Sequence, residues 1–417
     1  MAGGRCTTRA GSGGLPGPGR ALPAVALALA LLVGCGGTAT PDASRAEVRR
    51  MLDRRAAAVL ERDGAAYRAT EAATPVPGQL ATGKAEFTNL RGLPLASWSY
   101  DLTAFHRSGD RATAEAALRY RIRGYDRAPV TAARTLNLVR DADGRWRVAA
   151  DEPAENGTEQ LWEQGPIRAV RGARSLVLGV GRPTADLRAY AALADRAVPA
   201  VTEAWGGNWA RRVMVVVPES LEEMAGLLGA PASGYRGIAA VTTGETGGAA
   251  KVPADRIVVN PEAYALLGGL GKQVVLTHET THVATRAHTD ASTPLWLSEG
   301  YADWVGYRGT GRTAADVAPE LRRAVAEGRA PAGLPADADF GFSDDSGGLA
   351  EAYEGGWLAC RMIADRWGEV RLDAFYRAVG AHASREGAVE GALREVLGTT
   401  VEDFTVRWRE YVRAELG

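Results

Sequence analysis

Residues 278–282 read His-Glu-Thr-Thr-His, and Glu299 follows seventeen residues after the second histidine. A helix advances about 100° per residue, so side chains four positions apart point to nearly the same side. The two imidazoles of this segment can therefore reach one metal ion. Glu279 lies between them and can direct its carboxylate at a water molecule on that ion. The spacing predicts a helix that carries half of a metal site.

The pattern HExxH is typical of zinc held by two histidines, with the glutamate as a general base. A catalytic zinc ion usually has three protein ligands and one open position, which makes Glu299 the natural third ligand beside His278 and His282. Asp303 lies four residues after Glu299, on the same helix face, where it can accept the remaining ring N–H of a ligating histidine. We expect one Zn²⁺ per chain. The competing interpretation is an ordinary helix with exposed histidines and solvated carboxylates.

These motifs together resemble the gluzincin metallopeptidases, the group that includes thermolysin and the aminopeptidase N type. Residues 296–300, Trp-Leu-Ser-Glu-Gly, also resemble a segment common in the peptidase MA-like branch. The resemblance covers residues 170–417, with strong motifs only at 278–303. It implies zinc ligands at His278, His282 and Glu299, a base at Glu279, and hydrolysis of peptide bonds. Here the second histidine and Glu299 are closer together than in those prototypes, and no Gly-x-Met-Glu-Asn-like segment precedes the zinc helix. We therefore expect an endopeptidase.

A hydrogen-bond donor beside the metal should stabilise the charge that develops on the carbonyl oxygen. Tyr353 begins a helix downstream of the zinc motifs, where related enzymes often carry a tyrosine or histidine. It is our candidate for this donor, and Tyr301 and His288 are the rivals. A tyrosine of the core or the surface is the alternative interpretation of Tyr353.

Residues 1–34 are predicted to be a lipoprotein signal peptide. Arginines precede an apolar run from Ala21 to Gly34, which is too short to span a bilayer and suits the apolar region of a signal sequence. The segment Leu-Val-Gly-Cys at 32–35 resembles the lipobox of bacterial lipoproteins, which implies cleavage before Cys35 and lipid attachment there. Residues 35–43 would form a tether, and the mature chain would lie on the outer face of the bacterial cytoplasmic membrane. A plain secretory signal is the alternative.

Composition narrows the class of protein. The chain has 417 residues, enough for two domains, and its 49 Lys and Arg balance 50 Asp and Glu, which gives no sign of a nucleic-acid partner. The expected partners are a peptide or protein substrate and the membrane. Beyond Cys6 and Cys35 only Cys360 remains, so no internal disulfide is possible, and its apolar helical setting predicts a buried thiol.

The pattern of apolar residues predicts an α+β protein. Residues 44–152 are predicted to form a helix (44–70) and four strands (96–106, 111–123, 130–140 and 145–150). This order resembles the nuclear-transport-factor-two-like cone, which can enclose a pocket or have a filled core. The isolated His106 is interpreted as a surface or core histidine. Residues 153–169 would form a linker.

Residues 170–417 alternate strands (175–180, 212–217, 237–243 and 256–260) with helices (184–205, capped by Thr184, and 220–228). The resemblance implies a mixed sheet in this domain and makes 238–243 the candidate edge strand along a cleft, although an interior strand is equally compatible with the pattern. The zinc-site helices are predicted at 270–286 and 294–308, a lid or solvated loop at 330–348, and C-terminal helices at 349–367, 372–381, 387–397 and 401–416.

Three hypotheses about function follow. The first is an active, membrane-anchored zinc metallopeptidase. The second is a catalytically inactive protein, zinc-binding or metal-free, that uses the cleft to bind a partner. The third is a ligand-binding surface lipoprotein whose N-terminal domain does the work. The intact HExxH, Glu299 and Asp303 favour the first, because an inactive relic would usually have lost one of them.

Overall fold

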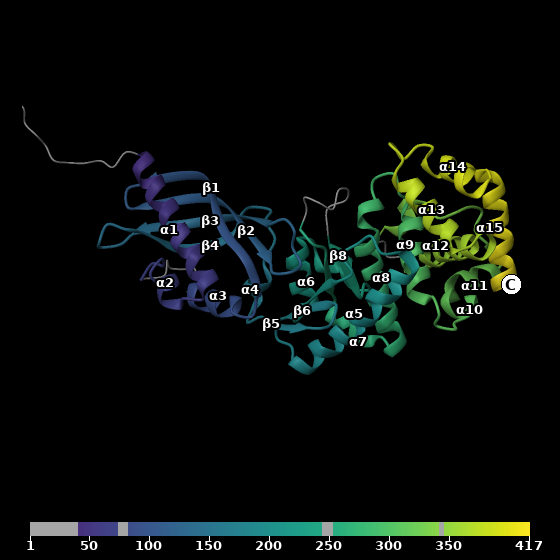
Figure 1. Ribbon diagram of the computed structural model, residues 1–417, viewed down its shortest axis with the longest axis horizontal. Coiled ribbons are helices and arrows are strands. Elements are labelled where there is room, and N and C mark those ends of the chain that lie inside the picture. Colours follow the sequence, from purple (N-terminus) through teal and green to yellow (C-terminus); the bar gives the residue numbers. More distant parts are fainter. Residues whose placement is uncertain (1–40, 74–81, 244–252, 342–345) are drawn as a thin grey trace, which may run out of the picture. The chain divides into compact units, whose positions relative to one another are not determined.

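The computed structural model describes residues 41–73, 82–243, 253–341 and 346–417 (Figure 1). Residues Pro41–Gly417 form one compact unit with two β-sheets, one antiparallel and one mixed, which makes the chain an α+β protein. The predicted signal peptide and Cys35 lie outside the described residues. Among the described residues, no helix is both long enough and apolar enough to cross a bilayer.

The N-terminal sheet is antiparallel, and its strands follow one another in sequence order. Each strand alternates buried and exposed residues, as expected of a sheet with one covered face. The predicted helix 44–70 is divided in two, because Arg62 has a positive φ of 59° and Asp63 caps the next helix by accepting hydrogen bonds from two backbone N–H groups. A third helix, before the first strand, was not predicted. The elements are α1 (Pro41–Glu61), α2 (Gly64–Arg68), α3 (Thr82–Leu90), β1 (Leu95–Ser108), β2 (Arg111–Ile122), β3 (Val130–Arg140) and β4 (Trp146–Pro153).

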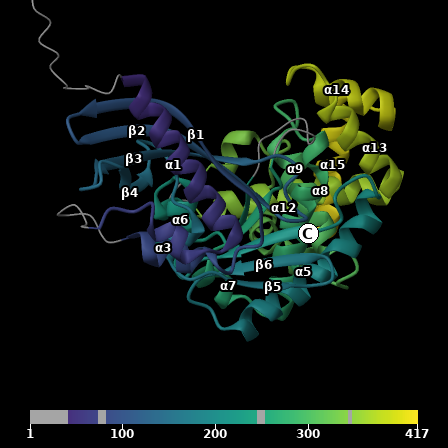
Figure 2. The same cartoon turned by 60° about the vertical axis from the view of Figure 1, so that its left-hand side comes forward.

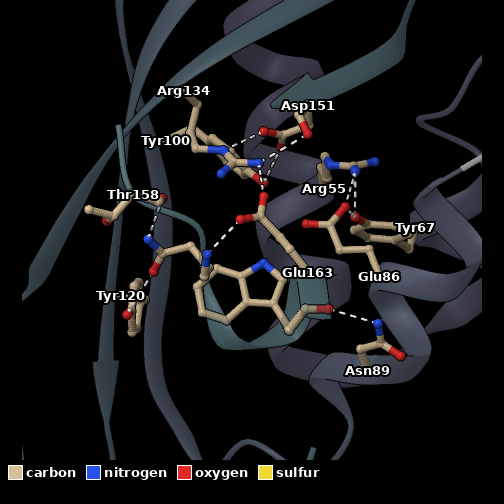
Figure 3. Close-up of polar contacts among 12 residues, drawn as sticks. Arg55, Tyr67, Glu86, Asn89, Tyr100, Tyr120, Arg134, Asp151, Thr158 and Glu163 are labelled. Atoms are coloured by element: carbon tan, nitrogen blue, oxygen red, sulfur yellow. Dashed lines mark hydrogen bonds and ion pairs between the residues drawn. The ribbon is translucent and has the colours of Figure 1, made fainter. Parts of the chain in front are cut away.

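Buried arginines make ion pairs within this sheet, from the sheet to a short helix that follows it, and between two N-terminal helices (Figure 3). Arg134 of β3 lies 2.7 Å from Asp151 of β4 and 2.6 Å from Glu163, which belongs to the short helix α4 (Leu161–Gln164). Arg55 of α1 lies 3.3 Å from Glu86 of α3. Both arginine side chains are about 1% exposed, so each depends on its carboxylates for charge compensation.

The second sheet has the order β5-β6-β7-β9-β8. Its three central strands are parallel, and an antiparallel strand closes each edge. The predicted strand 237–243 is therefore an edge strand and not an interior one, and it is shorter than expected. The first strand of this sheet and α4 both overlap the segment predicted to be a linker. The strands are β5 (Arg168–Arg171), β6 (Ser175–Gly179), β7 (Val213–Val217), β8 (Ala240–Thr243) and β9 (Arg256–Val259).

Helices α5 and α8 cover one face of this sheet, and α5 lies along β5 and β6 (Figure 2). The prediction that Thr184 caps α5 is wrong: the helix begins after Pro183, with no capping side chain. Helices α7, α10 and α11 were not predicted. The helices of this part are α5 (Thr184–Trp205), α6 (Leu221–Leu228), α7 (Pro261–Leu266), α8 (Gly269–Thr285), α9 (Leu295–Tyr307), α10 (Ala314–Val317), α11 (Pro319–Ala326), α12 (Ser346–Trp367), α13 (Glu369–Gly380), α14 (Ala388–Ala392) and α15 (Val401–Leu416).

Helix α9 is packed between α8 and α12. A Cβ atom at Gly300 would lie only 2.3 Å from the backbone of Gly356, so the axes of α9 and α12 approach each other where neither residue has a side chain. Within the segment 330–348, Asp337–Phe340 forms a 3₁₀ turn and α12 begins at Ser346; Asp344 and Asp345 lie outside the described residues.

Candidate metal centre

Two helices supply the groups of the centre. Helix α8 carries His278, Glu279 and His282, and α9 carries Glu299 and Asp303. Packing of α9 against α8 brings the two histidines and Glu299 together, with one ligand atom of each within 4.8 Å of the others. The Nε2 atoms of the histidines are 3.0 Å apart. Glu299 Oε2 is 3.3 Å from Nε2 of His278 and 3.4 Å from Nε2 of His282.

This triangle has the size that a zinc ion requires. With bonds of about 2.0–2.1 Å, neighbouring ligand atoms of a tetrahedral zinc ion lie about 3.3–3.4 Å apart. The three observed separations agree with that value to within a few tenths of an ångström. Two imidazole nitrogens and one carboxylate oxygen are also a donor set used by catalytic zinc sites. The residues present therefore fit zinc.

Asp303 lies behind the first histidine, as the sequence predicts. Its Oδ1 atom is 2.7 Å from Nδ1 of His278, which leaves Nε2 of the ring directed at the centre. Burial alone would lower the pKa of His278, but Asp303 and Glu299 hold that pKa well above its usual value. Burial alone would likewise raise the pKa of Glu299, but the two histidines hold it well below its usual range. The carboxylates thus favour positive charge at this point, whether it comes from protons or from a metal ion.

Glu279 is on the same helix and is 6% exposed. Its Oε2 atom accepts a hydrogen bond of 2.6 Å from the hydroxyl of Thr242, which lies on β8. A cavity of about 580 Å³ adjoins the carboxylate and is lined by residues of the edge strand, α8, α9 and α12. His278, Glu279 and Asp303 are among the lining residues, so the cavity borders this side of the centre.

The candidate donor Tyr353 also lines this cavity. Burial, together with the charges of Glu299, Asp303 and Glu279, raises the pKa of Tyr353 far above its usual value, so the phenol keeps its proton and can donate it in a hydrogen bond. Tyr353 thus shares the cavity with His278 and Glu279, and its role as the hydrogen-bond donor stays a prediction.

The two alternative candidates for the hydrogen-bond donor, Tyr301 and His288, make other contacts. The hydroxyl of Tyr301 donates to Asp373 at 2.5 Å, and the ring of His288 lies against Trp205 with its Nε2 atom 2.7 Å from Arg377. Neither rival is among the described residues that line the cavity.

Sequence reasoning missed a second phenol in the cavity, that of Tyr307. The signal for it was present, because Tyr307 follows Asp303 by four residues and so shares its helix face.

Two other predictions concern residues outside the centre. Cys360 is fully buried in α12, and burial raises the pKa of its thiol, which fits an inert structural cysteine. His106 is exposed on β1.

Comparisons with known proteins give little further information. No protein-family model and no curated protein matches the chain. Among solved structures, the chain is similar to a two-domain M1 zinc metallopeptidase, a mutant form bound to L-arginine, with 12% identity and a TM-score of 0.33. The match covers 77% of this chain and 61% of that one, so the chain spans less than two thirds of that protein's length. At these values the likeness establishes neither family nor activity, and the geometry of the centre must carry the functional conclusion.

Proposed function

We propose that this chain is a zinc metallopeptidase that hydrolyses peptide bonds. The observation that carries the proposal is the triangle of ligand atoms from His278, His282 and Glu299, with sides of 3.0–3.4 Å, beside the buried carboxylate of Glu279. The order of edge strand, zinc helix, second site helix and C-terminal helices fits a gluzincin arrangement. The helix and antiparallel sheet before them fit a nuclear-transport-factor-two-like cone.

An extended peptide is the substrate that this site suits best. In the described part of the chain, β8 pairs only with β9, so its other edge offers backbone groups to a further strand. Ala240 of β8 also lines the cavity beside Glu279. A peptide that adds to this edge would be aligned by main-chain hydrogen bonds, which require no particular side chains. Because such pairing does not depend on a chain terminus, we favour an endopeptidase.

In the proposed mechanism, a zinc ion held by the three ligands would supply Lewis acidity to water and to the scissile carbonyl. Glu279 accepts a proton from the attacking water and later transfers it to the leaving amine. Tyr353 donates a hydrogen bond to the carbonyl oxygen as negative charge develops there. Asp303 holds the tautomer of His278 that directs Nε2 to the centre.

The test of this function compares two variants with the wild-type chain. We expect about one zinc per chain in the wild type and in Glu279→Gln, but not in His282→Ala. Cleavage of casein or of a peptide library should disappear in both variants, and proteomics should find new protein termini that depend on Glu279. A fully metallated wild type without hydrolysis would support the alternative of an inactive zinc-binding protein. A chain that binds no zinc would support either a metal-free protein that binds a partner in the cleft or, if a ligand stabilises residues 44–152 against heat, a binding role for the N-terminal domain.

We further propose that the mature chain is anchored through a lipid on Cys35 to the outer face of the bacterial cytoplasmic membrane. The support is the sequence of residues 21–35 alone. Labelled fatty acid should be incorporated into the wild-type chain and not into Cys35→Ala, which should leave the membrane fraction. A wild-type product that carries an unmodified Cys35 would contradict this proposal.

A further inference from the structure

The edge strand β8 has a polar side chain on its inner face. Side chains alternate along a strand, so Ala240 and Thr242 share one face and Val241 points to the other. Ala240 packs in the apolar cluster that contains Leu276 of α8, whereas Val241 packs in a different cluster on the opposite face of the sheet. Thr242 therefore faces the zinc helix.

The hydroxyl of Thr242 has two acceptors within reach on α8. It lies 2.6 Å from Oε2 of Glu279 and 3.1 Å from the backbone oxygen of the same residue. A hydroxyl carries one proton, and a separation of 2.6 Å falls in the range of an O–H···O⁻ bond to a carboxylate, about 2.5–2.7 Å. The proton therefore goes to the carboxylate.

This hydrogen bond matters because Glu279 is buried and makes no ion pair among the described residues. A buried carboxylate without a cation depends on hydrogen-bond donors to hold its orientation. The threonine holds Oε2, which restricts the rotation of the carboxylate, and the second oxygen makes no hydrogen bond among the described residues.

We propose that Thr242 is a positioning residue: it fixes the carboxylate of Glu279 in the orientation needed to accept a proton. This inference rests on the function proposed above. It also gives β8 two roles, because the backbone of the strand would align the peptide while its threonine aligns the base. The strand would therefore position the peptide through its backbone, and the base through the side chain of Thr242 alone.

The chain offers a matched control in the next residue. Thr243 belongs to the same strand and is also half-buried, but its hydroxyl lies 3.3 Å from backbone atoms of Arg256 and not near the centre. Thr243→Val removes a hydroxyl from the same strand without removing a contact to Glu279. Thr242→Val removes the donor with little change of shape, Thr242→Ala removes it with less steric demand, and Thr242→Ser keeps it.

The first measurement is steady-state cleavage of a peptide by the full-length, zinc-loaded chain. Because a hydrogen bond to a charged group is lost, kcat of Thr242→Val and Thr242→Ala should fall about 10- to 100-fold. KM and zinc content should stay within about two-fold of the wild type, because neither substrate binding nor the ligands are altered. Thr242→Ser and Thr243→Val should keep kcat within about three-fold.

The second measurement does not depend on turnover. A peptide hydroxamate presents a zinc-binding group whose hydroxyl proton a carboxylate at Glu279 can accept. Calorimetry should show its affinity weakened by about ten-fold or more in Thr242→Val and in Glu279→Gln, and unchanged in Thr242→Ser and Thr243→Val.

The outcomes separate the inference from the proposed function. If the wild type cleaves peptides and Thr242→Val matches it in both measurements, the inference is wrong and the function stands. The inference is equally wrong if Thr242→Ser loses as much kcat and hydroxamate affinity as Thr242→Val, because the hydroxyl donor at position 242 would then be irrelevant. If the wild type cleaves nothing but binds the hydroxamate in a way that depends on Thr242, the positioning role stands and the peptidase function is wrong. A wild type that neither cleaves nor binds overturns both.

Discussion

The contact between Asp303 and His278 yields the sharpest prediction for metal binding. We expect Asp303→Ala to weaken zinc binding by about 10- to 100-fold, because loss of a carboxylate behind a ligating histidine has an effect of this size. The bond is 2.7 Å long and the Asp303 side chain is only 19% exposed, so water replaces it poorly. The change corresponds to about 1.4–2.7 kcal/mol.

A second variant shows how much of this loss of zinc-binding free energy comes from the charge of Asp303. Asp303→Asn keeps an acceptor for Nδ1–H but removes the charge. A charge-assisted hydrogen bond is about twice as strong as a neutral one, so this variant should lose about half of the free energy, which is roughly three- to ten-fold in affinity. The graded order wild type, Asp303→Asn, Asp303→Ala distinguishes orientation of His278 from simple attraction of the cation.

The assay is competition for zinc against a chromophoric chelator of known affinity, at constant pH and ionic strength. Asp373→Asn is the control, because Asp373 is also a half-buried carboxylate bonded to a side chain of α9, the hydroxyl of Tyr301, but it lies outside the centre. The control should bind zinc as the wild type does. Equal zinc affinity in Asp303→Ala and wild type, or an equal loss in Asp373→Asn, would refute the positional role of Asp303.

Three further predictions concern stability. Gly300→Ala places a Cβ 2.3 Å from the backbone of Gly356 and should lower the free energy of unfolding by about 3 kcal/mol or more in urea titrations, with weaker zinc binding because α9 must shift. Arg134→Met leaves the buried carboxylate of Asp151 and the half-buried one of Glu163 without their cation, and should lower the free energy of unfolding by about 3–5 kcal/mol in the same assay. Burial raises the pKa of Glu354 from 4.5 to about 7, so between these pH values the folded chain keeps a proton that the unfolded chain has released. Glu354 should therefore contribute a fall in stability of about 3 kcal/mol as pH rises from about 4.5 to 7, and the total fall should be smaller by that amount in Glu354→Gln.

Each of these predictions has an outcome that would contradict it. Gly391→Ala is the control for Gly300→Ala, because no atom lies within 4 Å of its Cβ, and it should be neutral or slightly stabilising. A Gly300→Ala chain as stable as the control would show that α9 and α12 are not as close as described. Equal pH dependence in wild type and Glu354→Gln would assign the titration to another group. An Arg134→Met chain with unchanged stability would mean that the ion pairs of Figure 3 contribute nothing net.

The sequence identified the local parts of the molecule well. Helices α5 and α15 were predicted to the residue, and the four strands of the first sheet to within a few residues, because apolar periodicity acts within one element. That His278 and His282 lie on one side of a helix could be predicted for the same reason, because residues four apart share a helix face whatever the rest of the chain does. Short elements with weak periodicity, such as β5 and α3, were not found.

The sequence by itself determined which residues lie on each helix face, since helical geometry relates neighbours in the chain. Only the tertiary structure decided which faces meet. It placed Glu299 of α9 against the histidines of α8, put Tyr353 in the cavity and its rivals elsewhere, and set β8 at an edge of the sheet. It also brought Thr242 to Glu279, 37 residues further along the chain. Such contacts depend on the packing of several elements at once, and no local pattern of residues specifies them.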